Sequence, residues 1–221
     1  MVFRITIDGT AGSGKSTTAD VLASKLNYTR VNSGYIYRCI TAYVLNIYSE
    51  NYDLSSNEFF EKIQNLKISL KNNRYYVMDQ DFTDKLRTPL IDKHVPNISK
   101  EPFIRKKVRQ LQLDIINSSE TGVVIDGRDT GTVVVPDAEI KFFMTASPIV
   151  RAKRMKKNEN EDILPLDEIE KAIIKRDELD KNRKEGKLIC PKDAIIIKND
   201  NYTFQEQVDI MLEKIFEIMK Q

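Results

Sequence analysis

The segment IDGTAGSGKSTT at residues 7–18 constrains the fold of this chain more than any other feature. It places three of the chain's eight glycines within six positions and ends in Lys-Ser-Thr-Thr. The spacing matches G-x-x-x-x-G-K-[ST], which has physical meaning only where a strand precedes the glycines and a helix follows them. VFRITI at 2–7 alternates as a strand does, and apolar residues recur at helical spacing from Ser16 to Asn27. The sequence therefore predicts a phosphate-binding loop.

Such a loop aims several backbone N–H groups at one point, at the positive end of a helix dipole. Lys15 is expected on a solvent-facing loop, from which it reaches the outer phosphates, and the Ser16 hydroxyl can take a position on magnesium. A glycine-rich turn that binds nothing is the alternative for the motif alone. The residues expected to bind a nucleotide here are Gly9, Thr10, Ala11, Gly12, Ser13, Gly14, Lys15, Ser16 and Thr17.

Composition narrows the class of ligand. Charged residues are 31% of the 221, but they nearly cancel to a net +2, which favours small phosphorylated ligands over nucleic acid. No apolar run approaches the roughly 20 residues of a membrane span, so a cytoplasmic protein without a membrane partner is expected. Cys39 and Cys190 lack metal or redox spacing and are interpreted as buried thiols. His94 is the only histidine, which disfavours a histidine relay.

Strands and helices alternate along the chain, which predicts an α/β protein with a parallel sheet. The expected strands are five short apolar runs: RITID, YTRVN, GVVIDG, IKFFMTA and AIIIKN. A long excursion, residues 34–104, separates the second run from the third. It is therefore interpreted as a subdomain inserted into the sheet.

The inserted segment carries its own local signals. Residues 35–48 and 55–66 have helical patterns, the second with serines ahead of an acidic first turn. Residues 67–82 alternate on either side of Asn72-Asn73, which predicts a β-hairpin. A patch of this size is too small to be stable alone. Residues 103–117 resume a helix and return the chain to the core.

Two charged stretches follow the fourth predicted strand, IKFFMTA. RAKRMKKNENED at 151–162 packs five basic residues into seven positions, and a solvated helix with a polar loop is the simplest interpretation. A helix predicted over 165–186 places Arg176, Asp180 and Arg183 on one face. Salt bridges within the helix explain this pattern, and so do contacts to a phosphate and a sugar hydroxyl; both interpretations stay open.

The segment IDGRDTGTVVVPDA (125–138) adds a pattern that resembles the bacterial-type cytidylate kinases of the nucleoside monophosphate kinase superfamily. The resemblance covers nearly the whole chain and also rests on IDGTAGSGKST, NSGYIYR, KFFMTASPIVRAKR and RDELDKNR. It implies the P-loop monophosphate kinase fold: a five-stranded parallel sheet flanked by helices, an inserted acceptor-binding subdomain with a small antiparallel sheet, and a short lid. The implied boundaries are core 1–33, insert 34–104, core 105–150, lid 151–164 and core 165–221.

The resemblance also implies a role for each matching residue. The acceptor pocket would contain Ser33, Tyr37, Arg38, Arg105, Arg128, Asp129, Arg176, Asp180 and Arg183. Within it, Arg38 and Arg128 would bind the phosphate of CMP, Arg105 and Asp129 the cytosine edge, and Arg176 and Asp180 the ribose. Lys15, Arg128, Arg151 and Arg183 would be catalytic, and Arg154 would contact ATP.

Four positions depart from the family pattern. Thr10 stands where the family usually has proline, Asn32 where it has aspartate and Tyr35 where it has alanine. Pro96 falls about where a serine often contacts the base, so one hydrogen bond to cytosine is lost or supplied otherwise. The sequence therefore constrains the choice of base less than it constrains the type of reaction.

The implied reaction moves the γ-phosphoryl group of ATP to CMP, and to dCMP, with Mg²⁺ as cofactor in a monomeric enzyme. A phosphate acceptor is largely ionised at neutral pH, because its second pKa is about 6, and needs no general base. Repeated arginines suit such an acceptor through bidentate hydrogen bonds. A mobile lid would exclude water from the transfer.

Three alternatives compete with this interpretation. The chain could phosphorylate another acceptor such as UMP or a small acid. It could be a GTPase-like switch, although it lacks an N-K-x-D sequence for reading guanine. A nucleic-acid-binding module is the third, and it would require strongly salt-dependent binding.

Overall fold

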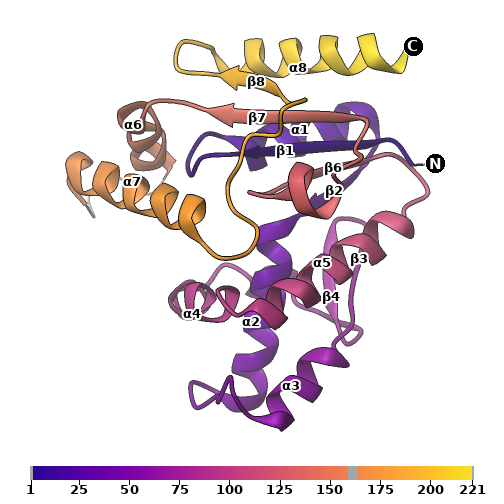
Figure 1. Ribbon diagram of the computed structural model, residues 1–221, viewed down its shortest axis with the longest axis vertical. Helices are drawn as coiled ribbons and strands as arrows, with labels where there is room; N and C mark the ends of the chain where they lie inside the picture. Colours follow the sequence, from indigo (N-terminus) through magenta and orange to yellow (C-terminus); the bar gives the residue numbers. More distant parts are fainter. Residues whose placement is uncertain (1, 159–163, 221) are drawn as a thin grey trace. The chain divides into compact units, whose positions relative to one another are not determined.

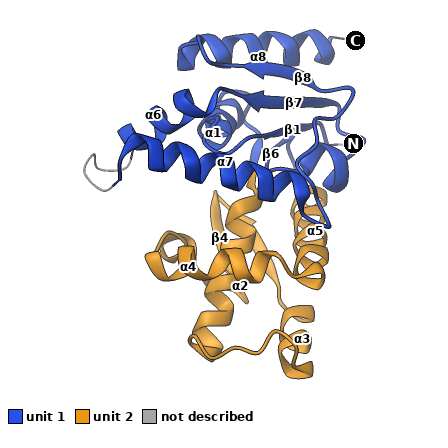
Figure 2. Cartoon of the chain, turned by 60° about the vertical axis from the view of Figure 1, so that its left-hand side comes forward, with its two compact units in different colours: residues 1–30, 120–221 blue, residues 31–119 orange. Residues whose placement is uncertain are grey.

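The computed structural model describes residues 2–158 and 164–220, with the side chain of Asn158 left out. The chain forms two compact units, coloured separately in Figure 2. Unit 1 is built from Met1–Arg30 and Glu120–Gln221, and unit 2 is Val31–Ser119.

The sheet of unit 1 has five strands in the order β2-β6-β1-β7-β8. The strands are β1 (Arg4–Gly9), β2 (Thr29–Asn32), β6 (Val123–Asp126), β7 (Ile140–Thr145) and β8 (Ile195–Lys198). β1 pairs in parallel with both β6 and β7, and β7 pairs in parallel with β8. All five predicted runs are strands, and the α/β class with a parallel sheet is confirmed.

β1 lies in the middle of the sheet, where the strand order reverses (Figure 1). The chain continues from β1 to β2 and β6 on one side, and then to β7 and β8 on the other. In open α/β sheets the connections diverge at this switch point and leave room for a ligand at the carboxyl ends of the strands. The glycine-rich loop follows β1 and therefore lies at this point.

Two helices share one hydrophobic core with the sheet. α1 (Lys15–Leu26) contributes Ala19 and Leu22, and α8 (Phe204–Met219) contributes Met211 and Ile215, all fully buried against the strands. α1 ends where predicted, since Asn27 adopts a left-handed conformation with φ of 54°.

Unit 2 consists of helices and a small antiparallel sheet. Its elements are α2 (Ser33–Tyr48), α3 (Asn57–Gln64), β3 (Ile68–Lys71), β4 (Arg74–Val77), β5 (Gln80–Asp81), η1 (Thr83–Lys85), α4 (Pro89–Ser99) and α5 (Pro102–Asn117). The predicted hairpin is confirmed: β3 and β4 pair around Asn72 and Asn73, whose φ values of 50° and 59° suit a tight primed turn. The sequence missed β5, which joins through a second turn at Met78-Asp79, both also at positive φ.

The compact unit extends beyond the predicted insert of 34–104. α5 belongs to unit 2 because it packs on α2, α3, α4 and β3. Its buried face includes Ile104, Val108 and Leu111. The helix was expected to return the chain to the core, but its apolar stripe is covered within unit 2.

Two further helices complete unit 1. α6 (Pro148–Asn158) packs on α7 (Leu166–Asn182) through Ala152, Ile169 and Ile173. Of the predicted lid at 151–164, residues 159–163 lie outside the described residues. α7 is shorter than the predicted helix over 165–186, and Arg183 is its C-cap in an extended conformation. In the described parts of the chain, no helix is long and apolar enough to cross a membrane.

Candidate active site

The loop after β1 is held against the neighbouring strand. Gly9 has φ of +145°, and a Cβ there would lie 1.9 Å from the carbonyl oxygen of Met144. Thr10 N donates to that same oxygen at 3.2 Å. Only glycine allows this approach of two backbones, so the first glycine of the motif fixes where the loop leaves the sheet.

Lys15 is the first residue of α1, and only 6% of it is exposed. Its Nζ donates to Thr10 O at 2.6 Å and lies 3.4 Å from Ser13 Oγ. Burial lowers the pKa of Lys15 well below its usual value, and Arg128 lowers it further, whereas Asp126 opposes the shift. The expectation of a solvent-facing lysine is therefore wrong, because the loop folds over the side chain and supplies the ammonium group with acceptors.

A buried amide network supports the loop from the side of β8 and α8. Asn199 Nδ2 donates to Ser13 O at 2.9 Å and to Gln207 Oε1 at 2.6 Å, and Gln207 Nε2 donates to Thr18 Oγ1. Arg154, expected to contact ATP, donates to Asn199 Oδ1 at 3.0 Å and Asn199 O at 2.6 Å. Arg154 thus reaches the loop through Asn199, which the sequence did not single out.

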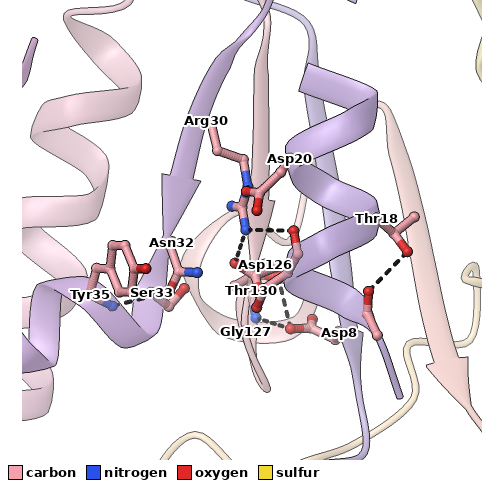
Figure 3. Close-up of polar contacts among 12 residues, drawn as sticks. Asp8, Thr18, Asp20, Arg30, Asn32, Ser33, Tyr35, Asp126, Gly127 and Thr130 are labelled. Atoms are coloured by element: carbon pink, nitrogen blue, oxygen red, sulfur yellow. Dashed lines mark hydrogen bonds and ion pairs between the residues drawn. The ribbon is translucent and has the colours of Figure 1, made fainter. Parts of the chain in front are cut away.

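Ser16 pairs with a carboxylate at the end of β6. Its Oγ donates to Asp126 Oδ2 at 2.6 Å. The other oxygen of Asp126 accepts from Arg30 Nη2 at 2.6 Å, and Arg30 Nε donates to Asp20 at 2.7 Å (Figure 3). A hydroxyl beside a carboxylate is a donor set that suits Mg²⁺. The sequence predicted Ser16 alone, although Asp126 ends an apolar strand next to β1 and could have been proposed.

Arg30→Met is expected to lower the free energy of unfolding by about 3–5 kcal/mol, because it leaves the buried carboxylate of Asp126 without its cation. The side chains of Arg30 and Asp126 are only 9% and 6% exposed. Asp20→Asn is the control, since that partner of Arg30 is 65% exposed, and a loss of at most about 1 kcal/mol is expected. Urea unfolding followed by circular dichroism measures both, and equal losses would contradict the assignment.

Asp8 anchors the segment that follows β6. Its carboxylate accepts from Thr130 N and Oγ1, each at 2.9 Å (Figure 3). It also accepts from Gly131 N at 2.7 Å. These residues begin the π-helical turn η2 (Thr130–Val134). Burial raises the pKa of Asp8, and the three donated hydrogen bonds oppose that shift. Asp8 thereby fixes the backbone directly after Arg128 and Asp129.

Three of the predicted acceptor residues meet within unit 1. Arg128 Nε donates to Asp180 Oδ2 at 2.6 Å, and Arg183 Nη2 lies 3.1 Å from Asp180 Oδ1. Arg176, an exposed residue of α7, is close enough to Lys15 to lower the pKa of that amine. A salt bridge within the helix region joins Asp180 to Arg183, and Asp180 also bridges to Arg128.

Arg151, expected to be catalytic, is buried. Its Nη1 donates to Ala11 O at 2.7 Å and pairs with Asp177 Oδ2 at 2.7 Å, and its Nε donates to Ala146 O at 2.8 Å. Asp177 was not predicted, although it follows Arg176 directly. In this structure Arg151 contacts the phosphate-binding loop itself.

Asp129 also lies in unit 1, and the other four predicted acceptor residues lie in unit 2. Ser33 Oγ accepts from the buried Gln112 at 2.8 Å. The Arg105 guanidinium lies 5.6 Å from the ring centre of Tyr37. Arg38, also in unit 2, donates to Leu86 O at 2.8 Å and pairs with Asp92. Gln112 is a second supporting residue that no pattern in the sequence singled out.

Three of the four positions that depart from the family pattern lie in unit 2, and the fourth, Thr10, lies in the loop of unit 1. Asn32 Oδ1 caps α2 by accepting from Tyr35 N at 3.1 Å, so the amide takes over a capping function that a carboxylate also performs. The Tyr35 ring lies edge-on to Tyr75 and 5.3 Å from the Arg87 guanidinium carbon. Pro96 lies inside α4, where it has no N–H or side-chain hydroxyl to donate.

Cys39 and His94 belong to unit 2, and Cys190 belongs to unit 1. Cys39 is fully buried, as predicted, and burial raises the pKa of its thiol. Cys190 is only partly buried. His94 contacts the hydroxyl of Tyr52 at 2.7 Å and the carboxylate of Glu50 at 2.9 Å.

The fold has known counterparts. A shikimate kinase from Bacteroides thetaiotaomicron superposes with a TM-score of 0.52 over 99% of both chains, at 13% sequence identity. A protein of Eubacterium ventriosum ATCC 27560, described as uncharacterized, superposes with a TM-score of 0.55 over 98% of this chain and 99% of its own, at 15% identity. At these identities the likeness concerns the fold, and it confirms the P-loop kinase architecture.

Similarity in sequence is much closer. The family described as cytidylate kinase matches residues 5–217. A probable cytidylate kinase of Vairimorpha ceranae (strain BRL01) is 42% identical over 220 residues, covering 100% of this chain and 98% of that protein. Cytidylate kinases of Clostridium botulinum (strain Langeland) and Thermotoga maritima are 40% and 35% identical, covering 98% and 99% of this chain and 97% and 99% of their own lengths. Since the match spans the loop, the Arg128 segment, α6 and α7, the chain belongs to the cytidylate kinase family of phosphotransferases.

Proposed function

We propose that the protein transfers the γ-phosphoryl group of ATP to CMP, and also to dCMP, giving ADP and CDP or dCDP. The observation that carries this proposal is the convergence of cations on the phosphate-binding loop of unit 1. Arg151 Nη1 donates to Ala11 O of the loop at 2.7 Å, and Arg128 and Arg176 both lower the pKa of the buried Lys15. Several arginine and lysine side chains around one anion-binding loop suit a site that binds several phosphate groups.

The chain's own residues would act by position and charge. The loop N–H groups would bind the ATP phosphates, and Lys15 would exchange Thr10 O for phosphate oxygens. Arg128 and Arg183 would bind the acceptor and the transferred phosphoryl group, held apart and oriented by the carboxylate of Asp180 between them. Transfer through a loose transition state needs mainly such cations around the equatorial oxygens, and the ionised acceptor needs no base.

Ser16 and Asp126 would hold Mg²⁺ together with the nucleotide. Their oxygens lie 2.6 Å apart, and Arg30 fixes the second carboxylate oxygen. When bound, Mg²⁺ supplies charge neutralisation on the β- and γ-phosphates. The hydrogen bonds from Arg30 and Ser16 fix the orientation of this carboxylate.

Unit 2 carries the other residues for which we propose acceptor binding. Ser33, Tyr37, Arg38 and Arg105 are proposed as its acceptor-binding residues, with the insert at 34–104 carrying two of them. The Arg105 guanidinium lies over the Tyr37 ring, and a guanidinium and an aromatic ring are side chains that suit a pyrimidine edge and face.

A coupled assay with ATP and Mg²⁺ tests the proposal on a panel of CMP, dCMP, UMP and AMP. CMP is expected to have the highest kcat/KM, followed by dCMP. Preference for UMP or AMP would indicate a different monophosphate kinase, and ATP hydrolysis without phosphorylation of any acceptor would contradict the transferase assignment.

A further inference from the structure

The phosphate-binding loop is held at one residue by side chains from two different helices. Asp177 Oδ1 on α7 accepts from Ala11 N at 2.9 Å. Arg151 on α6 donates from Nη1 to Ala11 O at 2.7 Å. The two side chains also pair with each other at 2.7 Å, so the three contacts close a ring around Ala11.

This ring is buried and its members are fully engaged. The side chains of Arg151 and Asp177 are 4% and 7% exposed, and Ala11 is 3% exposed. A third hydrogen bond, from Arg151 Nε to Ala146 O at 2.8 Å, ties the guanidinium to the end of β7. A charged pair buried this deeply is costly to desolvate, so all of its hydrogen bonds must be made. This requirement restricts Arg151 and Asp177 to a well-defined geometry.

The ring determines which way one peptide of the loop faces. In a trans peptide the carbonyl oxygen and the next N–H point in opposite directions. With Ala11 O held by Arg151, the N–H of Gly12 points away from Arg151, and the carbonyl oxygen cannot turn into the loop, where it would repel an anion. Gly12 itself lies against α6, since a Cβ there would be 3.2 Å from Met155 Sδ and 3.4 Å from Arg151 Cβ.

We propose that Arg151 and Asp177 are positioning residues, which hold the Ala11–Gly12 peptide in its anion-binding orientation and so set the affinity for the donor nucleotide. The inference rests on the proposed binding of ATP by this loop. It assigns Asp177 a role that the sequence did not suggest, and it makes Arg151 act through the loop backbone rather than on the transferred phosphoryl group.

Equilibrium binding of a non-hydrolysable ATP analogue with Mg²⁺, measured by calorimetry, tests the role without turnover. Asp177→Asn keeps an acceptor for Ala11 N but loses the ion pair, and Arg151→Met loses the contact to Ala11 O. Each is expected to weaken binding about tenfold or more, the effect of one charge-assisted hydrogen bond. The affinity of the double variant for the analogue is expected to lie within about twofold of the affinity of whichever single variant binds more weakly, because both changes release the same peptide.

Steady-state kinetics separates positioning from direct catalysis. Both single variants are expected to raise the KM for ATP and leave the KM for CMP within about twofold, and Arg151→Lys is expected to recover part of the affinity by pairing with Asp177. Asp167→Asn is the matched control, because it removes an exposed carboxylate from the same helix, paired only with Lys171 among the contacts described. Unchanged analogue binding in Asp177→Asn, with a fall in kcat alone for Arg151→Met, would overturn the proposal.

Hydrogen exchange on the nucleotide-free wild type gives a test that needs no variant to fold. The Ala11 amide is expected to exchange as slowly as the amides of β1, and exchange at the rate of an open loop would also overturn the proposal. If the wild type does not bind the analogue at all, the proposed function is contradicted. The exchange rate of the Ala11 amide still tests whether the ring around Ala11 holds the loop.

Discussion

Lys15→Ala is expected to lower kcat/KM by at least about a hundredfold, the loss typical of removing one donor that stabilises transition-state charge. In the free protein the ammonium group is bonded to Thr10 O and is buried. A polyphosphate would offer it stronger acceptors, so its contribution is realised with the nucleotide bound. A coupled assay at saturating CMP measures the change.

The fold should survive this substitution. A buried ammonium whose pKa is lowered by burial destabilises the folded state when charged, so the thermal midpoint is expected to stay the same or rise. Lys25→Ala is the control, because Lys25 is exposed in the last turn of the same helix. Retention of more than about a tenth of wild-type turnover by Lys15→Ala would contradict the catalytic role.

Arg128→Lys and Asp129→Asn are expected to affect the acceptor in different ways, although the two residues are adjacent. Arg128→Lys should lower kcat/KM for CMP and UMP alike, by roughly ten- to a hundredfold, because the guanidinium fork that pairs with Asp180 and a phosphate is lost whatever the base. Asp129→Asn should narrow the preference for CMP over UMP by about tenfold, because an amide also donates to the carbonyl that uracil presents in place of the cytosine amine.

The ratio of kcat/KM for CMP and UMP in both variants decides this prediction. Lys181→Gln is a suitable control, since it removes a half-exposed cation from α7 that pairs with Glu178. The separation of roles fails if Arg128→Lys changes the ratio as much as Asp129→Asn does.

Several parts of the fold and site could be predicted because their signals are local. The alternation of VFRITI, the glycines before Lys15 and the Asn72-Asn73 pair each determine a strand, a loop or a turn from a few consecutive residues. The spacing of Arg176 and Asp180 puts both on α7. Dihedral preferences and side-chain periodicity act over this range, so the α/β class and the nucleotide-binding loop follow from the sequence by itself.

The tertiary structure alone decided which distant residues support the site. Asp126 and Arg30 are 96 positions apart, and Ala11 and Asp177 are 166 apart. No pattern in the chain links such pairs, because they meet only once the strands have taken the order β2-β6-β1-β7-β8 and α6 and α7 have packed together.

The burial of Lys15 and the end of α7 before Arg183 have the same origin. The local sequence predicts that Lys15 is charged and that the residues of α7 have helical periodicity. The acceptors around Lys15 and the point at which α7 ends depend on tertiary packing instead. For this chain the sequence determined the chemistry that a phosphate-binding loop could perform, and long-range packing decided which buried carboxylates and arginines hold that loop in position.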